Sequence, residues 1–253
     1  MKVLLRLLCV VVLLLCPWVA RAEDSATAAM ARGDVCDEKL ETKEALAAYL
    51  EAEKLGRRDS EVLRKISREL ALSMPDAGSP EEKRALGEKA LAYSQRAVAA
   101  NPMDPHAQLG LAICYGRVAP FLDNKTKIAY SKLVKEQADK AIKLDPSLDY
   151  GYHVLGAWNY ELAGLNSVLR VVAKLIYGEL PTASYEEAVR NFKKAIELAP
   201  NRVVHHIELG RTYAAMGLAA LAREELNKGL ALPNREKDDP GTKERGRAAL
   251  KKL

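Results

Sequence analysis

The side chains best suited to acid–base or metal chemistry are four histidines, and each falls near the start of a predicted helix: His106, His153, His205 and His206. Two histidines on one helix bind a metal most readily at a spacing of four, which puts both rings on one face. His205 and His206 are neighbours, so their side chains diverge by about 100° around a helix axis. The spacing therefore favours separate histidines at helix starts or on the surface, and it predicts neither a metal site nor a catalytic centre.

Other sequence signatures of catalysis are absent from the chain. It has no glycine-rich phosphate loop, no zinc-binding cysteine pattern and no nucleophile elbow. We therefore predict no cofactor, no metal and no enzymatic activity.

The first 22 residues have the pattern of a secretory leader. Lys2 and Arg6 precede the apolar run LLCVVVLLLC at 7–16, and an A-x-A cleavage site follows at 20–22. A membrane-spanning helix needs about 20 apolar residues, so this run is short for a stable span. The pattern predicts a signal peptide and an exported protein, in a periplasm, a secretory lumen or outside the cell. If uncleaved, the segment would instead tether the chain to a membrane, with its bulk on the cytosolic face.

Cleavage would change both the charge and the cysteine content. Three basic residues and no acidic residue leave with the leader, so the formal net charge falls from +5 to +2. That balance gives no support for a nucleic acid partner, which requires a concentrated basic patch. Cys9 and Cys16 also leave, and Cys114 is predicted to be a small core residue. A bridge between Cys36 and Cys114 stays open in an oxidising compartment.

One short sequence recurs along the chain and marks a repeating unit. KAIKLDP at 140–146 returns as KAIELAP at 194–200, with a weaker form, RAVAANP, at 96–102. Each proline ends a helix, and similarly spaced helices follow: DPHAQLGLAICY, DYGYHVLGAWNY and VVHHIELGRTY. These spacings match the tetratricopeptide repeat, a pair of helices in 34 residues whose small residue lets the two helices approach closely.

The units are longer than 34 residues. Pro102, Pro146 and Pro200 are 44 and 54 residues apart, and the extra residues fall between the two helices of a pair, around 116–134 and 163–183. Helix starts are also marked in the sequence. The three clearest are Ser79-Pro80 with Glu82, Asp104-Pro105, and Ser184 with Glu187.

These features predict an all-α fold, a solenoid of tetratricopeptide-like helical hairpins with lengthened repeats. After the signal peptide at 1–22 we expect N-terminal helices with a partial repeat at 23–58, the repeat domain at 59–235 and a polar C-terminal helix at 236–253. The charge-rich stretch NREKDDPGTKERGR, which begins at Asn234, is interpreted as a solvated linker and cap.

The lengthened units carry a further resemblance. LAICYGRV, KIAYSKLVKEQADKAIKLDP, YHVLGAWNYELAG and VLRVVAKLIYGELPTASYEEAVRNFKKAIELAPN resemble the regulator of microtubule dynamics family, over roughly residues 60–235. The resemblance implies a tetratricopeptide-like adaptor without a catalytic centre that associates with microtubules from the cytosolic side. Because the leader predicts export, we expect a protein-binding scaffold and keep the microtubule-associated or membrane-tethered adaptor as the alternative.

Stacked helix pairs curve, so their first helices line a concave surface that can hold a protein or peptide partner. Aromatic residues and arginine are typical anchors of such interfaces. The candidate lining residues are His106, Leu109, Tyr150, His153, Ala157, Tyr160, Ile207 and Arg211. Whether these side chains bind a partner or are only solvated and locally packed stays open.

The second insertion, LNSVLRVVAKLIYGEL, has the periodicity of a helix. Its apolar face combines Leu165, Val168, Leu169, Val172 and Ile176. We expect this face to pack on a neighbouring helix, and the alternative is a groove or a membrane-surface element. Candidate binding residues of this helix are Arg170, Lys174 and Tyr177.

Overall fold

The computed structural model describes residues 24–178 and 182–253, so the predicted signal peptide lies outside the described residues. Within those two ranges all regular secondary structure is helical, which confirms the all-α prediction. No helix among these residues is long and apolar enough to cross a membrane.

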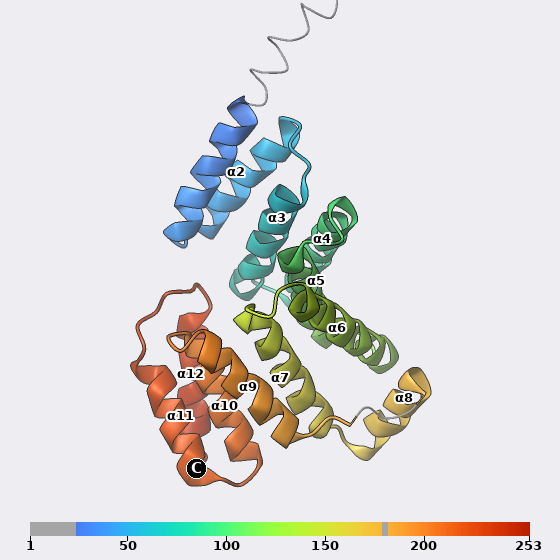
Figure 1. Cartoon of the computed structure of the whole chain (residues 1–253), viewed down its shortest axis with the longest axis vertical. Helices are drawn as coiled ribbons and strands as arrows, with labels where there is room; N and C mark the ends of the chain where they lie inside the picture. Colours follow the sequence, from blue (N-terminus) through green and yellow to red (C-terminus); the bar gives the residue numbers. More distant parts are fainter. Residues whose placement is uncertain (1–23, 179–181) are drawn as a thin grey trace, which may run out of the picture.

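Four helical hairpins form the body of the molecule (Figure 1). Their members are α3 (Ser60–Ser73) with α4 (Pro80–Ala100), α5 (Pro105–Val118) with α6 (Asn124–Leu144), α7 (Asp149–Ala163) with α9 (Tyr185–Leu198), and α10 (Val203–Ala215) with α11 (Ala219–Ala231). The solenoid of tetratricopeptide-like pairs that the sequence predicts is therefore present.

Further helices extend both ends of this body. A helix over residues 24–38 and α2 (Thr42–Lys54) precede the first pair, and α12 (Asp239–Leu250) packs on α10 and α11 at the other end. Buried residues of the helix 24–38 and of α2 to α5 belong to one hydrophobic cluster, so the N-terminal helices share the core of the repeats.

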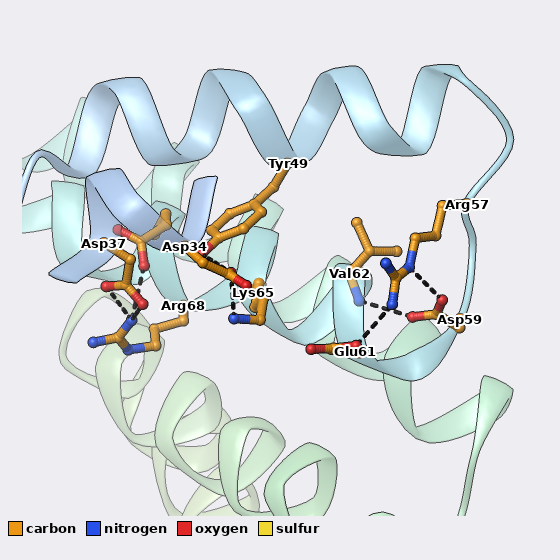
Figure 2. A network of polar contacts seen from close by, with 10 residues as sticks. Asp34, Asp37, Tyr49, Arg57, Asp59, Glu61, Val62, Lys65 and Arg68 are labelled. Carbon is orange, nitrogen blue, oxygen red and sulfur yellow. Dashed lines mark hydrogen bonds and ion pairs between the residues drawn. The ribbon is translucent and has the colours of Figure 1, made fainter. Parts of the chain in front are cut away.

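Polar side chains fix the N-terminal helices to α3 (Figure 2). The Tyr49 hydroxyl donates a hydrogen bond to Asp34 (2.9 Å), and the Lys65 ammonium pairs with the same carboxylate (2.7 Å). Arg68 pairs with Asp37 at 2.5 Å. Since Lys65 and Arg68 belong to α3, two ion pairs join the helix 24–38 to the first pair.

The three helices whose starts are most clearly marked in the sequence begin at those capping residues. Ser79 Oγ accepts a hydrogen bond from the Glu82 amide, and Ser184 Oγ accepts one from the Glu187 amide, both at 3.1 Å. The Asp104 carboxylate accepts from two amides in the first turn of α5. These caps satisfy amides that have no partner inside the helix.

In two of the pairs a glycine of the first helix lies in close contact with the second helix. A Cβ added at Gly156 would lie 2.8 Å from the Phe192 ring of α9, and one at Gly210 would lie 2.7 Å from Leu226 of α11. Real side chains do not approach so closely, so glycine is required for these two helix pairs to pack as they do.

The lengthened units are built in two ways. In α4 and α6 the second helix itself is extended to 21 residues, preceded by a short 3₁₀ turn, η1 (Met74–Asp76) or η2 (Ala119–Phe121). The third pair instead carries a separate helix, α8 (Ser167–Tyr177), between α7 and α9. The prediction that the extra residues fall between the two helices of a pair is thus confirmed for 163–183, whereas most of 116–134 belongs to the end of α5 and the lengthened α6.

The two cysteines within the described ranges do not form the bridge that the sequence left open. Cys36 and Cys114 are both free thiols. Cys114 is buried in the N-terminal cluster, where its sulfur lies 3.3 Å from Ser67 Oγ. It therefore serves as a core residue of the α3–α5 contact.

Candidate binding surface on the first helices

The first helices of the pairs form a continuous inner row. Each contacts the next along the solenoid, α3 with α5, α5 with α7 and α7 with α10, and α12 continues the row beyond α10. In stacked hairpins this row lines the concave side. We use the term concave face for the surface formed by these five helices.

Four of the predicted lining residues form two groups on the concave face. Tyr150 and His153 meet His205, which the sequence did not place among them, with ring centroids 4.9 to 5.8 Å apart. Farther along, the Arg211 guanidinium lies over the Tyr160 ring at 5.6 Å.

Four other predicted lining residues do not join these groups. Ala157 is partly buried against the cluster that contains Phe192. Leu109 is buried in the cluster between α5, α6 and α7, and Ile207 is fully buried under α11 and α12, so neither is available to a partner. His106 is exposed in the first turn of α5, away from the other histidines. Neighbouring positions on a helix differ by about 100° in direction, so a lining position is easily confused with a packed one.

His153 and His205 form a buried hydrogen-bonded pair. Their Nδ1 atoms are 3.1 Å apart, and His205 Nε2 lies 2.7 Å from the Asp149 carboxylate. Because an ionised carboxylate only accepts, His205 donates from Nε2 and is left with an accepting Nδ1 when neutral. His153 therefore donates from its own Nδ1, and the two neutral rings and the carboxylate form one chain of donors and acceptors.

Burial keeps this histidine pair uncharged. It lowers the pKa of His153 well below the usual value, helped by the neighbouring His205. It also lowers the pKa of His205, although the hydrogen bond to Asp149 opposes the shift. Burial acts in the other direction on the pKa of Asp149, but the bond from His205 and the charge of Arg202 outweigh it and leave that pKa below its usual value. The cluster is thus a structural hydrogen-bond chain, because both rings are enclosed.

Arg202 lies at the centre of the charged part of the concave face. It pairs with Asp149 at 2.8 Å and with Glu236 at 2.9 Å, and its guanidinium lies 5.0 Å from the centre of the Tyr150 ring. The sequence analysis did not single out Arg202. Arg202 could have been predicted from its position, because it lies just before α10, one turn ahead of His205, and so reaches the same face as that histidine.

The linker between α11 and α12, residues 232–238, is exposed at 233–235 and is attached to other parts of the fold by its last three residues. Asp238 pairs with Arg117 of α5 at 2.5 Å, and Lys237 pairs with Asp76 of η1 at 2.7 Å. In Figure 1 it is the red loop at the end of the C-terminal half that lies nearest α3. The interpretation of this charge-rich stretch as a solvated linker therefore holds for the exposed Asn234 and Arg235 and is wrong for residues 236–239, which are partly or fully buried.

Internal hydrogen bonds also fix the shape of the linker. The Asp239 carboxylate accepts from the backbone amides of Arg235 (2.7 Å) and Glu236 (2.8 Å), and Lys243 donates to the Leu232 carbonyl. Burial raises the pKa of Glu236, while the charge of Arg202 acts against that shift.

The remaining histidine, His206, is engaged separately. Its Nδ1 lies 2.8 Å from Glu225 of α11, and its Nε2 lies 2.9 Å from the Pro200 carbonyl. Within residues 24–178 and 182–253, no group of three or more histidine, cysteine, aspartate or glutamate side chains is arranged to hold a metal ion.

Helix α8 leaves much of its apolar surface uncovered. Ala173 is buried, but Val168, Val171 and Leu175 are 68%, 63% and 80% exposed. The expectation that Val168 lies on a packed face is therefore wrong. Its physical reason is that α8 rests on α6, which covers only one narrow side of it.

The candidate binding residues of α8 differ in their surroundings. Arg170 donates to the carbonyls of Leu165 (2.9 Å) and Ala163 (3.0 Å), which fixes the turn from α7 into α8. Tyr177 lies 3.1 Å, oxygen to oxygen, from Ser131 of α6. Lys174 is exposed.

Comparison with known protein families gives a match over most of the chain. The model of the family described as Regulator of microtubule dynamics protein 1-3 matches residues 29–253. The chain belongs to this family.

Curated relatives are about one third identical to this chain over the aligned residues. Regulator of microtubule dynamics protein 1 from Mus musculus is 32% identical over 83% of this chain and 69% of its own length. The human protein 1 is 32% identical over 64% of this chain and 52% of its own length, and protein 2 from Macaca fascicularis is 33% identical over 58% and 36%. The chain thus spans about half to two thirds of the protein 1 relatives and a smaller share of protein 2.

Solved structures support the fold alone. A thermophilic TPR protein of Thermus thermophilus, TTC0263, superposes with a TM-score of 0.63 at 18% identity, covering 89% of this chain and 98% of that one. PilW, described as a widely conserved type IV pilus biogenesis factor, superposes with a TM-score of 0.52 at 14% identity, covering 80% of this chain and 76% of its own.

Proposed function

We propose that this chain is an adaptor that binds a protein partner on its concave face and performs no catalysis. Its family and its tetratricopeptide-like fold support a protein-interaction role. The observation that carries the choice of surface is a pair of partly exposed arginine–aromatic contacts on the concave face, Arg202 over Tyr150 and Arg211 over Tyr160. Arginine and aromatic side chains held by a rigid scaffold need little ordering when a partner binds.

A non-catalytic role is supported by the enclosure of the best-placed acid–base groups. His205 is fully buried and His153 nearly so, and each ring nitrogen that contacts the other or Asp149 is already used in the hydrogen-bond chain. A general base must reach a substrate proton within hydrogen-bond distance, which the fully buried His205, with both ring nitrogens engaged, does not offer.

The test of the concave face is quantitative partner capture with paired variants. Arg211→Ala and Tyr160→Ala remove a stacked pair from the concave face, whereas Arg190→Ala removes an exposed arginine from the outer helix α9. We expect the first two to weaken capture of an identified partner at least about tenfold, as anchor residues do, and the third to leave it unchanged. Equal capture by all three variants would contradict the proposal.

A second candidate partner is the microtubule, because the relatives are named as regulators of microtubule dynamics. Compartment separates this candidate from an exported scaffold, which the leader at 1–22 supports. N-terminal sequencing of the protein from fractionated cells decides between them. A chain beginning near Glu23 in an exported fraction supports the scaffold, and an intact Met1 with the bulk of the chain in the cytosol supports the tethered adaptor. Co-sedimentation with microtubules then tests the tethered form directly.

A further inference from the structure

The linker crosses between parts of the concave face that lie far apart in the sequence. It leaves α11, pairs with Arg202 before α10, then contacts Arg117 of α5 and Asp76 beyond α3. Its residues therefore occupy the place where a bound peptide would touch several first helices at once.

The contacts of the linker are those of a peptide ligand rather than of a packed core segment. Two carboxylates, Glu236 and Asp238, meet the guanidinium groups of Arg202 and Arg117 on different repeat units. Arginine presents a planar fork that matches a carboxylate, which makes it the usual recognition group for acidic side chains. All four side chains retain between about a quarter and a third of their exposure.

Space and an aromatic surface lie beside these pairs. The Tyr150 ring lies beneath Arg202, and an open cavity of about 300 Å³ is lined by residues of the α9–α10 turn and of the linker, including Arg202, Arg235 and Glu236. A peptide that displaced the linker would find this aromatic ring and both arginines on a preformed surface.

We infer that the linker is an intramolecular occupant of the concave face, and that this face binds an acidic, extended peptide segment through Arg117 and Arg202 once the linker is displaced. The inference rests on the proposed adaptor function and names the chemistry of its partner. Ion pairs that keep part of their exposure are individually weak, so a partner in sufficient concentration can compete with them. Because only molecules with a displaced linker can bind such a partner, the linker reduces the apparent affinity of the chain for it.

The third linker contact gives a way to weaken the occupant without changing the arginines. Lys237 pairs with Asp76 in the opposite sense, cation on the linker and anion on η1. Replacing Lys237 by glutamine removes this attachment and leaves Glu236, Asp238 and both arginines in place.

The experiment measures binding of three labelled hexapeptides to the full chain by fluorescence anisotropy: alternating Glu and Gly, alternating Gln and Gly, and alternating Lys and Gly. We expect the acidic peptide to bind the wild type weakly and the release variant E236Q/D238N about fivefold more tightly, because the competing carboxylates are gone. K237Q is expected to give a smaller gain, about twofold. The neutral and basic peptides should show no gain, and added salt should weaken acidic binding.

Charge removal from the face completes the test. In the release variant, Arg117→Gln or Arg202→Gln is expected to weaken acidic binding about tenfold, whereas the matched outer-surface change Arg190→Gln leaves it unchanged. Circular dichroism and thermal melting check that each variant is folded, and K237Q serves as the release variant if E236Q/D238N is not.

Two results would overturn the inference: equal affinity of the acidic peptide for the wild type and for both release variants, or equal binding by the Arg117 and Arg190 variants. If either occurs while capture of an identified partner still depends on Arg211 and Tyr160, the adaptor function stands and only the acidic-peptide inference is wrong. If capture is also independent of those two residues, both proposals are wrong.

Discussion

Helices α8 and α9 are consecutive and both amphipathic, yet the apolar face of α9 is buried and that of α8 is largely exposed. The 14-residue α9 lies against α7 and α10 and buries Ala188, Phe192 and Ala195. The 11-residue α8 rests on α6 and buries Ala173, with three large aliphatic side chains exposed. The difference teaches that an apolar stripe becomes core only where the solenoid supplies a second neighbour.

The linker 232–238 falls between these two cases. It has almost no apolar side chains to bury, but charged groups hold it to Arg117 and Arg202 at the concave face and to Asp76 of η1. The segments are thus held to the rest of the fold to a decreasing degree, from α9 through the linker to the exposed side of α8. We expect the change in the free energy of unfolding caused by substitutions to decrease in the same order.

Phe192→Ala should have the largest effect on stability. The ring fills the space above Gly156, where the backbone of α7 has no side chain, so its removal leaves a cavity that the pair cannot readily close. We expect a loss of about 3–5 kcal/mol in the free energy of unfolding, measured by urea denaturation. A loss below about 1 kcal/mol would mean that α9 is no better covered than α8.

Glu69→Gln tests how a buried carboxyl affects stability, because the Glu69 side chain is as fully buried as the Phe192 ring. Burial raises the pKa of Glu69 to about 7, with Arg68 opposing the shift and Asp37 adding to it. The folded chain therefore holds a proton that the unfolded chain releases near pH 4.5, so stability falls as pH rises from about 4.5 to 7.

Glu69→Gln has no carboxyl at this position, so it does not lose stability in this way as the pH rises. We expect Glu69→Gln to be more stable than the wild type by about 1–3 kcal/mol at pH 8 and nearly equal at pH 4. Glu88→Gln, on the exposed side of α4, is the matched control and should show no such pH dependence. A constant difference between wild type and Glu69→Gln across that range would show that the carboxyl is not protonated in the folded chain.

The buried histidine pair should give a pH dependence of opposite sign. The folded pKa values of His153 and His205 are lowered, so their contribution is present above about pH 6.5 and is lost as pH falls below it. Each histidine that stays neutral in the folded chain costs at most about 1.4 kcal/mol per pH unit in that range.

The measurement compares thermal melting at pH 6.5 and 5.5. The charged and titratable groups around the pair are Asp149, Arg202, Arg245, Tyr150 and His206, and none of them is altered in the variants. His153→Gln should show a shallower loss than the wild type on acidification, whereas His106→Gln, at an exposed position, should follow the wild type. Identical slopes for all three proteins would contradict the neutral pair.

Loosening the linker should lower the free energy of unfolding by less than the core substitution Phe192→Ala. Removing its two acidic contacts in E236Q/D238N eliminates partly exposed ion pairs, which are worth about 0.2–1 kcal/mol each. We expect a total loss of about 1 kcal/mol and faster hydrogen exchange at the amides of Arg235 and Glu236. Unchanged exchange at both amides would show that the Asp239 carboxylate alone holds the linker.

These regions also show which features the sequence could predict. Caps such as Ser184 with Glu187, and the close approach of Gly156 to its partner helix, depend on residues a few positions or one repeat apart, so local patterns carry them. The pairing of Arg117 with Asp238 joins residues 121 positions apart, and no local pattern encodes such a contact.

The same argument applies to the candidate site. The sequence placed Tyr150 and His153 on the concave face, but the meeting of His153 with His205 depends on how two repeat units stack. Leu109 differs from true lining positions by its direction around the axis, which shifts whenever a helix rotates slightly on its neighbour. For α8, the pattern shows what the helix could bury, and only the structure shows that α6 is its main neighbour.

Substitution on the uncovered side of α8 should have the smallest effect. Leu175→Ser and Val171→Ser replace exposed aliphatic side chains by a small polar one, so each should change the free energy of unfolding by less than about 0.5 kcal/mol. The matched control is Ala173→Leu, on the side that faces α6, where added volume should destabilise the packing of α8 by about 1–3 kcal/mol. Hydrogen exchange of the α8 amides separates a local effect from global unfolding, because only Ala173→Leu should accelerate it. If Leu175→Ser were as harmful as Ala173→Leu, the apolar stripe of α8 would have a covering partner in solution, and the contrast with α9 would disappear.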